Sequence, residues 1–479
     1  MRLFLAVAIC KILYNIGSRL GKGSSLPGRV ALTVYPGVLK RVGMPKNLIA
    51  VTGSNGKTST AEMLARALEA NGVSVGWNHE GANQIEGIAT LVLRTATFRG
   101  EVKRDALVLE CDERYTRRIF ENIRPSVVVV TNLCRDQLTR NGHHEFIQGC
   151  IRAAIDAAGD KLRLVLNADD PYVAALAAPQ MHNPGSGAPG CCFFGISNPT
   201  HDGTYSQRYA GGMYDDGAFC PVCKGRMQYD YYTAAHMGGY HCGDCGFSRP
   251  NPGFEVAGMD SETGEIAFGD GIKTKLAFPG LTGMYNLIAA VAAASEAGVR
   301  TGDAARALEG YELTGGRTVR FSLDDRDGIL LVSKHENSLS YNQSLAYIVG
   351  RGKPCTVVIM VDSISRKYYT SETSWLWDID FGILADESVK NIVLAGRYVN
   401  ELAARFAMTE VSQGIIGCVG DRAGLRDHIE RGTTGDVFLL TCFSDIPMRA
   451  ASSFCCMPRC SNCSRMVSPG GTAMIVLFW

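Results

Sequence analysis

A glycine-rich turn close to the N-terminal end of the chain is the feature that most constrains its fold. Residues 47–52 form an apolar segment typical of a buried strand, and the turn Gly53-Ser54-Asn55-Gly56-Lys57-Thr58 follows it directly. A helical pattern then runs from Thr58 to Ala70. A strand, a tight glycine turn and a helix in succession open a βαβ unit, so we expect an α/β fold with a parallel sheet covered by helices.

The same turn is suited to hold a nucleoside triphosphate. Glycines let backbone N–H groups approach phosphate oxygens, and the helix N-terminus adds its partial positive charge. Lys57 is expected to reach the β- and γ-phosphates, and the Thr58 hydroxyl to ligate Mg²⁺. The spacing departs from the standard phosphate loop, because Val51 stands where its first glycine belongs. A chance turn is the alternative, which the flanking strand and helix disfavour.

The remaining chain predicts two α/β units and an insertion. Further strands are expected at Ala106–Leu109, Val127–Val130 and Leu164–Leu166, and a helix at Asn286–Ala297. The pattern breaks between residues 179 and 252, which are dense in Gly, Pro, Tyr and Cys, and we interpret this stretch as an insertion. A second unit begins at Arg317, with strands expected at Ile329–Val332, Thr356–Val361, Asn391–Leu394 and Val437–Leu440. The expected parts are therefore an N-terminal amphipathic helix and lead-in (1–45), an ATP-binding domain (46–312, with the insertion at about 200–255) and a C-terminal α/β domain (313–479).

Charge and cysteine usage narrow the class of protein. The 48 basic and 47 acidic side chains nearly cancel, so no global basic field is available to hold nucleic acid. The 17 cysteines include one set at metal-site spacing, and most others are single. This arrangement argues against a secreted disulfide protein and favours a reducing, cytoplasmic compartment.

The N-terminal segment is apolar but short. Leu3–Ile9 follows a single basic residue, Arg2, and Lys11 interrupts the run soon after. A membrane span needs about 20 apolar residues, and no small-residue cleavage site follows. We expect an amphipathic helix that packs on the body or makes a peripheral membrane contact. A signal sequence or anchor is the alternative.

Four cysteines in the insertion have the spacing of a metal site. Cys220 and Cys223 form one C-x2-C pair, and Cys242 and Cys245 form a second. Such turns bring four thiolates around one tetrahedral ion, so we predict a structural Zn²⁺ with a closed coordination shell. Local basic charge is modest, which disfavours a ribbon that binds nucleic acid. A second group (Cys455, Cys456, Cys460 and Cys463) fits a metal site less well, and free thiols are the favoured interpretation there.

Several segments resemble the Mur ligase superfamily in order and spacing. They are the shortened loop at Thr52–Thr58, Leu109–Glu113, Thr131–Leu133 with Asp136–Leu138, Leu166–Pro171, Gly283–Asn286 and Gly316–Arg317. The resemblance implies that Glu110 binds Mg²⁺, a role that suits a carboxylate at the end of a parallel strand beside the loop. A solvated Glu110, a surface Arg317 and a plain turn at Asp169-Asp170 remain the alternatives.

Within that superfamily, the four-cysteine ribbon resembles the family of MurT subunits of bacterial lipid II isoglutaminyl synthase. The segments Arg19–Arg29, Glu80–Asn83, Gly87–Thr90, Arg320-Phe321 and Ser374–Phe381 are similar to that family too, so the resemblance covers roughly residues 15–440. It implies a Mur-ligase-like ATPase domain with an inserted zinc ribbon, followed by a C-terminal α/β domain. The end of the chain from Phe443 onward matches no pattern.

The resemblance implies a definite chemistry. MurT-like proteins use ATP to phosphorylate the α-carboxylate of D-glutamate in the lipid II stem peptide, and ammonia then gives D-isoglutamine. The implied catalytic residues are Lys57 and Glu110, and the implied metal ligands are Thr58 and Glu110 for Mg²⁺. The implied nucleotide contacts are Gly53, Asn55, Gly56, Lys57, Thr58, Ser59, Asn132, Asn167, Asp169, Asn286 and Arg317.

The ammonia source is expected to be a separate protein. No cysteine lies on a convincing Gly-x-Cys-x-Gly elbow, which a glutaminase nucleophile needs. A partner glutaminase resembling GatD is therefore implied, with Glu372 completing its Cys-His triad where the family has Asp. A plain surface Glu372 is the alternative. The lipid-linked substrate favours a cytoplasmic position at the inner face of the membrane.

Two other functions compete with this one. The first is a Mur or folylpolyglutamate type ligase that adds an amino acid to a carboxylate. The ribbon and the motif at Ser374–Phe381 argue against it. The second is a non-enzymatic zinc-ribbon module that binds nucleotide or nucleic acid, which the balanced charge and the clustered Mg²⁺-ATP ligands disfavour.

Overall fold

The computed structural model divides into two compact units, Met1–Gly316 and Arg317–Trp479. It describes residues 1–19, 24–79, 81–136, 141–159, 161–177, 190–197, 216–260, 263–277, 280–313, 318–323, 325–333, 336–362, 373–420 and 424–442. Some predicted residues lie outside this part of the chain: Glu80, Gln137, Leu138, Arg317, Glu372 and the cysteines at 455–463.

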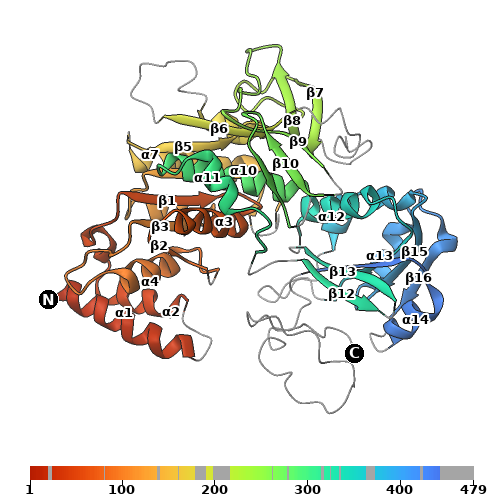
Figure 1. Ribbon diagram of the computed structural model, residues 1–479, viewed down its shortest axis with the longest axis horizontal. Coiled ribbons are helices and arrows are strands. Elements are labelled where there is room, and N and C mark those ends of the chain that lie inside the picture. Colours follow the sequence, from red (N-terminus) through yellow and green to blue (C-terminus); the bar gives the residue numbers. More distant parts are fainter. Residues whose placement is uncertain are drawn as a thin grey trace. The chain divides into compact units, whose positions relative to one another are not determined.

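The first unit is built on one large sheet, in the order β11-β10-β9-β6-β5-β4-β1-β3-β2 (Figure 1). Neighbouring strands from β2 to β9 run parallel, and β9-β10-β11 are antiparallel. The strands are β1 (Asn47–Thr52), β2 (Val75–Trp77), β3 (Ala106–Glu110), β4 (Val127–Val130), β5 (Arg163–Asn167), β6 (Cys191–Ile196), β9 (Phe254–Met259), β10 (Glu265–Phe268) and β11 (Lys273–Lys275). The predicted parallel-sheet core is thereby confirmed.

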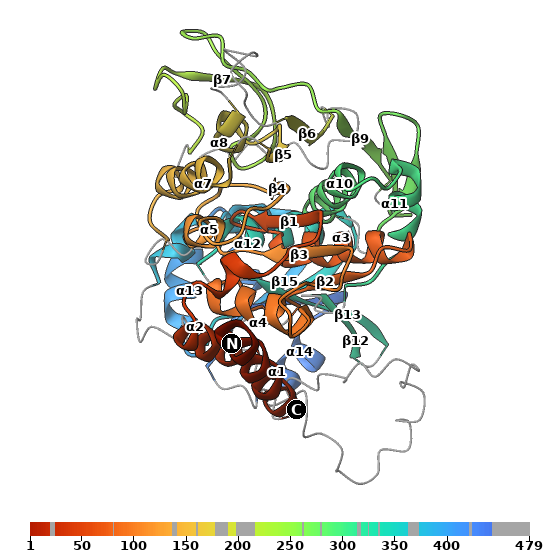
Figure 2. The ribbon, with the colours of Figure 1, turned by 90° about the vertical axis from the view of Figure 1, so that its left-hand side faces the viewer.

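Helices cover both faces of this sheet, as Figure 2 shows. On one side lie α4 (Ile85–Thr95), α5 (Thr116–Phe120) and α7 (His144–Ala158); on the other lie α3 (Lys57–Ala70), α10 (Leu281–Glu296) and α11 (Thr301–Ala307). Alternate residues of β1, such as Leu48 and Ala50, pack in the core that includes α4, α5 and α7. Because both faces are buried, the central strands are apolar throughout rather than alternating.

Two N-terminal helices pack against this unit. The helix α1 (Arg2–Arg19) lies on α2 (Leu26–Val34) and α4, and α2 also packs on α4. Gly28 makes the close approach of α2 and α4 possible, because a side chain there would collide with the Glu86 carbonyl. The short helix η1 (Val38–Arg41) leads to β1. Among the residues described, no helix is both long and apolar enough to cross a membrane.

The stretch from 179 to 252 is not an insertion throughout, so that prediction was wrong in part. Its segment Cys191–Ile196 is β6, which pairs with β5 on one side and β9 on the other. Two cysteines and a glycine hide its strand character in the sequence. The separate element within the stretch is the hairpin of β7 (Met227–Ala234) and β8 (Met237–Cys242), which forms its own two-stranded sheet. The turns α8 (Pro171–Ala174) and η2 (Ala175–Ala177) follow β5.

The second unit contains a smaller sheet in the order β12-β13-β17-β14-β15-β16, parallel except for the β12-β13 pair. Its strands are β12 (Thr318–Leu323), β13 (Arg326–Ser333), β14 (Cys355–Met360), β15 (Val389–Ala395), β16 (Ile416–Val419) and β17 (Asp436–Cys442). Its helices are α12 (Ser338–Gly350), η4 (Ser374–Asp378), η5 (Phe381–Ala385), α13 (Val399–Phe406), η6 (Gln413–Ile415) and α14 (Leu425–Gly432). Trp375, Leu376 and Phe381 of the Ser374–Phe381 motif are buried in this unit's core.

Candidate functional site

The phosphate loop joins the end of β1 to the start of α3, at the carboxyl edge of the parallel strands. Gly53 and Gly56 have positive φ angles of 126° and 82°, which L side chains rarely adopt. A side chain at Gly53 would collide with Thr131 and Asn132, and one at Gly56 with Asn286. The first turn of α3 directs its free N–H groups to this edge, with Thr58 exposed there and Ser59 half-buried. The loop therefore has the open backbone donors that an anion requires.

Residues that follow β4 hold the loop in shape. The Asn55 N–H donates to Asn132 Oδ1 at 3.0 Å, and Asn132 Nδ2 donates back to the Asn55 carbonyl at 3.2 Å. The Thr131 hydroxyl donates to the same carbonyl at 2.6 Å. On the other side, the Ser54 hydroxyl donates to the Cys134 carbonyl at 3.0 Å. Asn132, predicted to contact the nucleotide, thus bonds the loop itself through its side chain.

Lys57 is a buried cation in contact with its own loop. Its Nζ donates to Glu113 Oε2 at 2.9 Å and also to the carbonyls of Gly53 and Ser54. Burial opposes the charged form, but the neighbouring carboxylates, with Glu113 first among them, raise the pKa of Lys57 above its ordinary value. The ammonium is therefore charged throughout the physiological range.

Glu110 lies beside the loop because β3 pairs with β1 in a register that sets it opposite Val51. It is 4% exposed, and its backbone is held by Asn78, which donates to the Glu110 carbonyl and accepts from its N–H. Asn83 donates to Oε1 at 3.3 Å, whereas Oε2 has no hydrogen-bond partner among the residues that the structure describes. A buried carboxylate oxygen that lacks a donor is well suited to a hard cation such as Mg²⁺.

Two side chains predicted to contact the nucleotide are engaged within the protein. Asn167 is fully buried and donates to the Thr131 carbonyl at 2.9 Å. Asp169 is also fully buried, and it accepts from Arg249 Nε and from the Tyr285 hydroxyl, each at 2.7 Å. A nucleotide contact through either side chain is therefore not supported by this geometry. A third, Asn286, is 5% exposed and accepts from Thr60 at 3.4 Å.

Sequence reasoning missed several residues of this site. Glu113 is the main partner of Lys57, and Asn141 donates to its second carboxylate oxygen at 3.3 Å. Asn78 and Asn83 orient Glu110. Glu113 belongs to the same acidic segment as Glu110, so the run of acidic residues after β3 was the available signal. Arg317 and Glu372 lie outside the residues described, so their predicted roles stay predictions.

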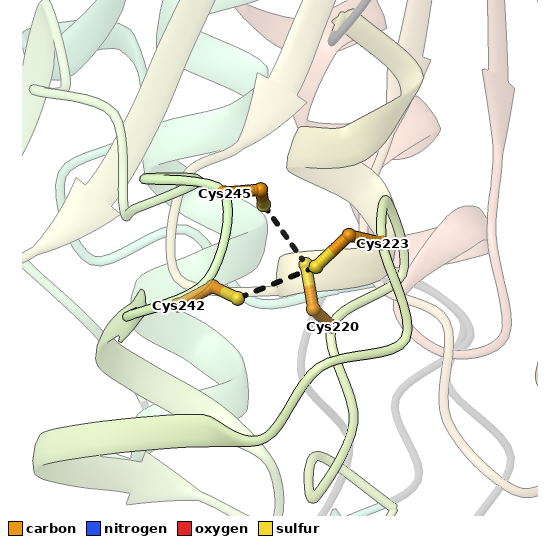
Figure 3. A group of neighbouring side chains, drawn as sticks. All are labelled: Cys220, Cys223, Cys242 and Cys245. Carbon is orange, nitrogen blue, oxygen red and sulfur yellow. Dashed lines mark hydrogen bonds between the residues drawn. The ribbon is translucent and has the colours of Figure 1, made fainter.

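The four predicted zinc ligands come together at the open end of the β7-β8 hairpin (Figure 3). The Sγ atoms of Cys220 and Cys245 are 3.7 Å apart, and those of Cys223 and Cys242 are 3.5 Å apart. A tetrahedral ion with Zn–S bonds of about 2.3 Å requires sulfur atoms about 3.8 Å apart. The geometry therefore fits a four-thiolate site.

Backbone N–H groups around these cysteines favour the thiolate form, whereas burial raises the pKa of Cys220 to about 12. Gly225 N–H donates to Cys223 Sγ at 3.4 Å. Burial works against ionisation of Cys242, but N–H donors from Cys245 and Asp244 outweigh it and lower the pKa of this thiol to about 7. Because four thiolates close the coordination shell, the arrangement suits a structural ion rather than a catalytic one.

Comparison with known proteins supports both units. A family model of the Mur ligase middle domain matches residues 51–202, and a model of the MurT ligase C-terminal region matches residues 335–445. The fold is similar to a pseudomurein peptide ligase type C from Methanothermus fervidus, with a TM-score of 0.63 and 21% identity over 85% of this chain and 78% of that one. The predicted Mur-ligase-like fold is confirmed.

Two curated relatives carry the same name. The MurT subunit of the glutamine-hydrolysing lipid II isoglutaminyl synthase from Streptococcus pneumoniae is 30% identical over 402 residues, which is 82% of this chain and 83% of the relative. The corresponding subunit from Staphylococcus aureus (strain N315) is 27% identical over 418 residues, 87% of this chain and 90% of the relative. The chain therefore belongs to the family of MurT subunits of lipid II isoglutaminyl synthase, which are ligases of the Mur type.

Proposed function

We propose that this chain uses ATP and Mg²⁺ to phosphorylate the α-carboxylate of D-glutamate in the lipid II stem peptide. A carboxylate oxygen attacks the γ-phosphorus and ADP leaves. Ammonia then adds to the acyl carbon, phosphate leaves, and the loss of a proton from nitrogen gives D-isoglutamine. The observation that carries the proposal is a phosphate loop beside a buried Glu110 oxygen that no donor of the described residues reaches, in a chain of this family.

The loop backbone and the side chains beside it each have a role in this reaction. Backbone N–H groups from Gly56 to Ser59 bind phosphate oxygens, and Lys57 adds a charged donor. Glu113 orients Lys57 until a phosphate oxygen takes its place as acceptor. Thr58 and Glu110 would hold Mg²⁺, which when bound neutralises charge on the transferring phosphoryl group. Positioning and charge neutralisation are the main demands of phosphoryl transfer, so these few groups suffice.

The competing function is a ligase that adds an amino acid instead of ammonia. The likeness to MurT subunits extends over both units and includes the C-terminal family model at residues 335–445. The four-thiolate hairpin, for which we propose a structural Zn²⁺, also favours amidation.

One reaction mixture distinguishes amidation from the addition of an amino acid. The purified chain, a glutaminase partner, ATP, Mg²⁺ and lipid II are incubated with glutamine or with ammonium, and the lipid product is analysed by mass spectrometry. We expect amidated lipid II and one ADP for each amide. Incorporation of a free amino acid without amidation would sink the proposal.

We further propose that a GatD-like glutaminase docks on the second unit and that Glu372 completes its Cys-His triad. The relatives support this, because they are named as subunits of a glutamine-hydrolysing enzyme. Glu372→Ala is expected to abolish glutamine-dependent activity and to spare ammonium-dependent activity. Glu410→Ala, at an exposed position of the same unit, is the matched control. Loss of both activities in Glu372→Ala would contradict a role in the partner's triad.

We also propose that α1 rests on the inner face of the membrane. On one face of α1, Ala6, Val7 and Cys10 are buried. The opposite face of the helix is apolar as well. Its exposed side chains are Phe4 (55%), Leu5 (48%), Ile12 (58%) and Ile16 (55%). Exposed apolar groups of this density mark an interaction surface.

Basic residues beside α1 favour an anionic lipid surface. A cavity of about 600 Å³ next to the helix is lined by Lys11, Arg94, Lys103 and Arg104, with Glu69 as the acidic residue among its lining groups. Ile12→Glu is expected to weaken binding to anionic vesicles about 10- to 100-fold, because burial of such a side chain contributes about 1.5–3 kcal/mol. Met408→Glu, at an apolar position 71% exposed in the second unit, is the control. Equal sedimentation of both variants with vesicles would contradict the proposal.

A further inference from the structure

A second group of potential metal ligands lies where the turn of the β7-β8 hairpin packs against residues that follow β4 and β5. Cys134 follows β4, Asp170 begins α8, and His236 lies in the turn between β7 and β8. One ligand atom from each lies within 4.8 Å of the other two. The three residues are 6%, 0% and 3% exposed, so the group is buried. The four-thiolate site does not include any of them.

The spacing of two of these ligands fits coordination better than hydrogen bonding. His236 Nε2 lies 3.4 Å from Asp170 Oδ1. A charge-assisted hydrogen bond between such groups would be about 2.7–2.9 Å long. Two ligands of a tetrahedral ion with bonds of about 2.0–2.1 Å lie about 3.3–3.4 Å apart. The observed separation therefore matches the edge of a coordination tetrahedron.

Two buried imidazoles in this region lack well-aligned hydrogen bonds. Neither ring nitrogen of His236 has a well-aligned hydrogen bond among the residues described, although Nε2 is paired with the Asp170 carboxylate, and neither nitrogen of His144, which is 2% exposed, has a hydrogen-bond partner there. Their rings are stacked, with centroids 5.9 Å apart. Buried polar nitrogens are almost always satisfied in native proteins, so two unsatisfied imidazoles side by side indicate a missing ligand. Each can offer a lone pair to a cation.

Asp170 is oriented for such a role. Its Oδ2 accepts from the Leu133 N–H at 2.6 Å, and its Oδ1 accepts from the N–H groups of Tyr172 and Val173 at 2.9 and 3.2 Å. These bonds fix the carboxylate plane, with Oδ1 3.4 Å from His236 Nε2. Arg135, whose charge acts on His236, is paired with Asp216 at 2.7 Å.

We propose that Cys134, Asp170 and His236 bind a second Zn²⁺. Sulfur, oxygen and nitrogen donors together suit this borderline-soft ion. The Cys134 thiol loses its proton to solvent when the ion binds. This inference concerns a site of its own and does not rest on the proposed amidation.

The ion would connect three parts of the first unit. Cys134 is bonded through its backbone to the phosphate loop, because its N–H donates to the Ser54 hydroxyl at 3.1 Å. Asp170 is rigidly attached to the end of β5, and His236 belongs to the hairpin that carries the four-thiolate site at its other end. A bound ion would therefore lock the hairpin to the element that shapes the phosphate loop.

Zinc content of the full-length chain tests the inference directly. After dialysis without a strong chelator, elemental analysis is expected to find about two Zn²⁺ per chain. His236→Gln and Cys134→Ser should each retain about one, while their Co²⁺-substituted forms keep the intense sulfur-to-cobalt absorption of the four-thiolate site. That retained absorption also shows that the hairpin is folded. The matched control, Cys223→Ser, should lose the intense absorption of the four-thiolate site.

Three results would overturn the inference. Wild-type protein could hold a single Zn²⁺ that Cys223→Ser removes. A second equivalent could survive in both His236→Gln and Cys134→Ser. It could instead disappear when Cys460 and Cys463 are changed to Ser, which would assign it to the C-terminal cysteines.

Discussion

The phosphate loop and the β7-β8 hairpin both hold several groups close together, and they do so by different means. The loop is supported by the large sheet beneath it and by hydrogen bonds from the residues after β4. The hairpin has two strands and a small apolar cluster that includes Met227, Tyr240 and Phe247. A two-stranded hairpin alone is marginally stable in water. The shape of the loop is thus a property of the sheet, whereas the hairpin needs anchors and, as we propose, an ion.

Loss of the Zn²⁺ proposed for the four-thiolate site should have the largest effect. It should unfold the hairpin and leave the phosphate loop intact. Apparent binding free energies of structural zinc sites are about 10–16 kcal/mol at neutral pH, so Cys220→Ser together with Cys245→Ser should unfold the hairpin. Hydrogen exchange is expected to rise sharply over residues 227–242 and to remain slow in β1 and α3. If exchange rises equally in both regions, the loop depends on the hairpin and the distinction fails.

The second-largest effect is expected from breaking the ion pair between Arg249, which follows the hairpin, and Asp169, which follows β5. Arg249→Met leaves the fully buried Asp169 carboxylate without its cation, which typically costs about 3–5 kcal/mol. Urea denaturation should show this loss. Lys273→Met removes an exposed ion pair with Glu265 and should cost at most about 1 kcal/mol. Equal losses of stability in the two variants would show that groups other than Arg249 stabilise the Asp169 carboxylate.

A change in the loop should affect chemistry rather than the hairpin. Lys57→Met is expected to slow ADP formation about 10²- to 10³-fold, the usual effect of losing one donor to a developing charge. Glutamine- and ammonium-dependent activity should fall together, and zinc content should not change. Lys46→Met, at an exposed position just before β1, is the control. A loss confined to the glutamine-dependent reaction would contradict our assignment of Lys57.

The smallest effect is expected from a change in Glu110, the proposed Mg²⁺ ligand beside the phosphate loop. Glu110→Gln keeps the size of the side chain and its bond to Asn83 but removes the charge that Oε2 offers. The Mg²⁺ concentration for half-maximal activity should rise about tenfold, as changes around metal sites commonly produce. Glu101→Gln, an exposed residue ahead of β3, should leave that concentration unchanged. An unaltered Mg²⁺ requirement in Glu110→Gln would exclude Glu110 as a ligand.

Much of the first unit could be predicted because its strands are buried on both faces. The predicted bounds of β1 and β4 agree with the structure, since each is an uninterrupted apolar run followed by a polar turn. The strand β6 was missed, because Cys191, Cys192 and Gly195 weaken its pattern and the stretch around it is rich in glycine and proline. Its place in the sheet comes from pairing with β5 and β9.

The residues of the candidate site also divide into those that the sequence predicts and those that only the structure brings together. Lys57, Glu110 and the four ribbon cysteines could be proposed from the sequence because each lies in a local motif whose spacing reflects its expected chemistry. Glu113 could not, since it becomes the partner of Lys57 only when β3 pairs beside β1. Its acidic character was visible in the sequence, but its partner was not.

The sequence by itself determined the phosphate loop, the paired cysteines and the parallel sheet, because these depend on neighbours within a few residues or on simple apolar runs. Only the tertiary structure decided what Asp169 and Asp170 do. Both are buried where the hairpin docks, with Arg249 bound to Asp169 across 80 residues of chain and His236 beside Asp170. The role of a buried carboxylate is set by the cation or donor that packs against it, and packing brings together residues that no local pattern relates.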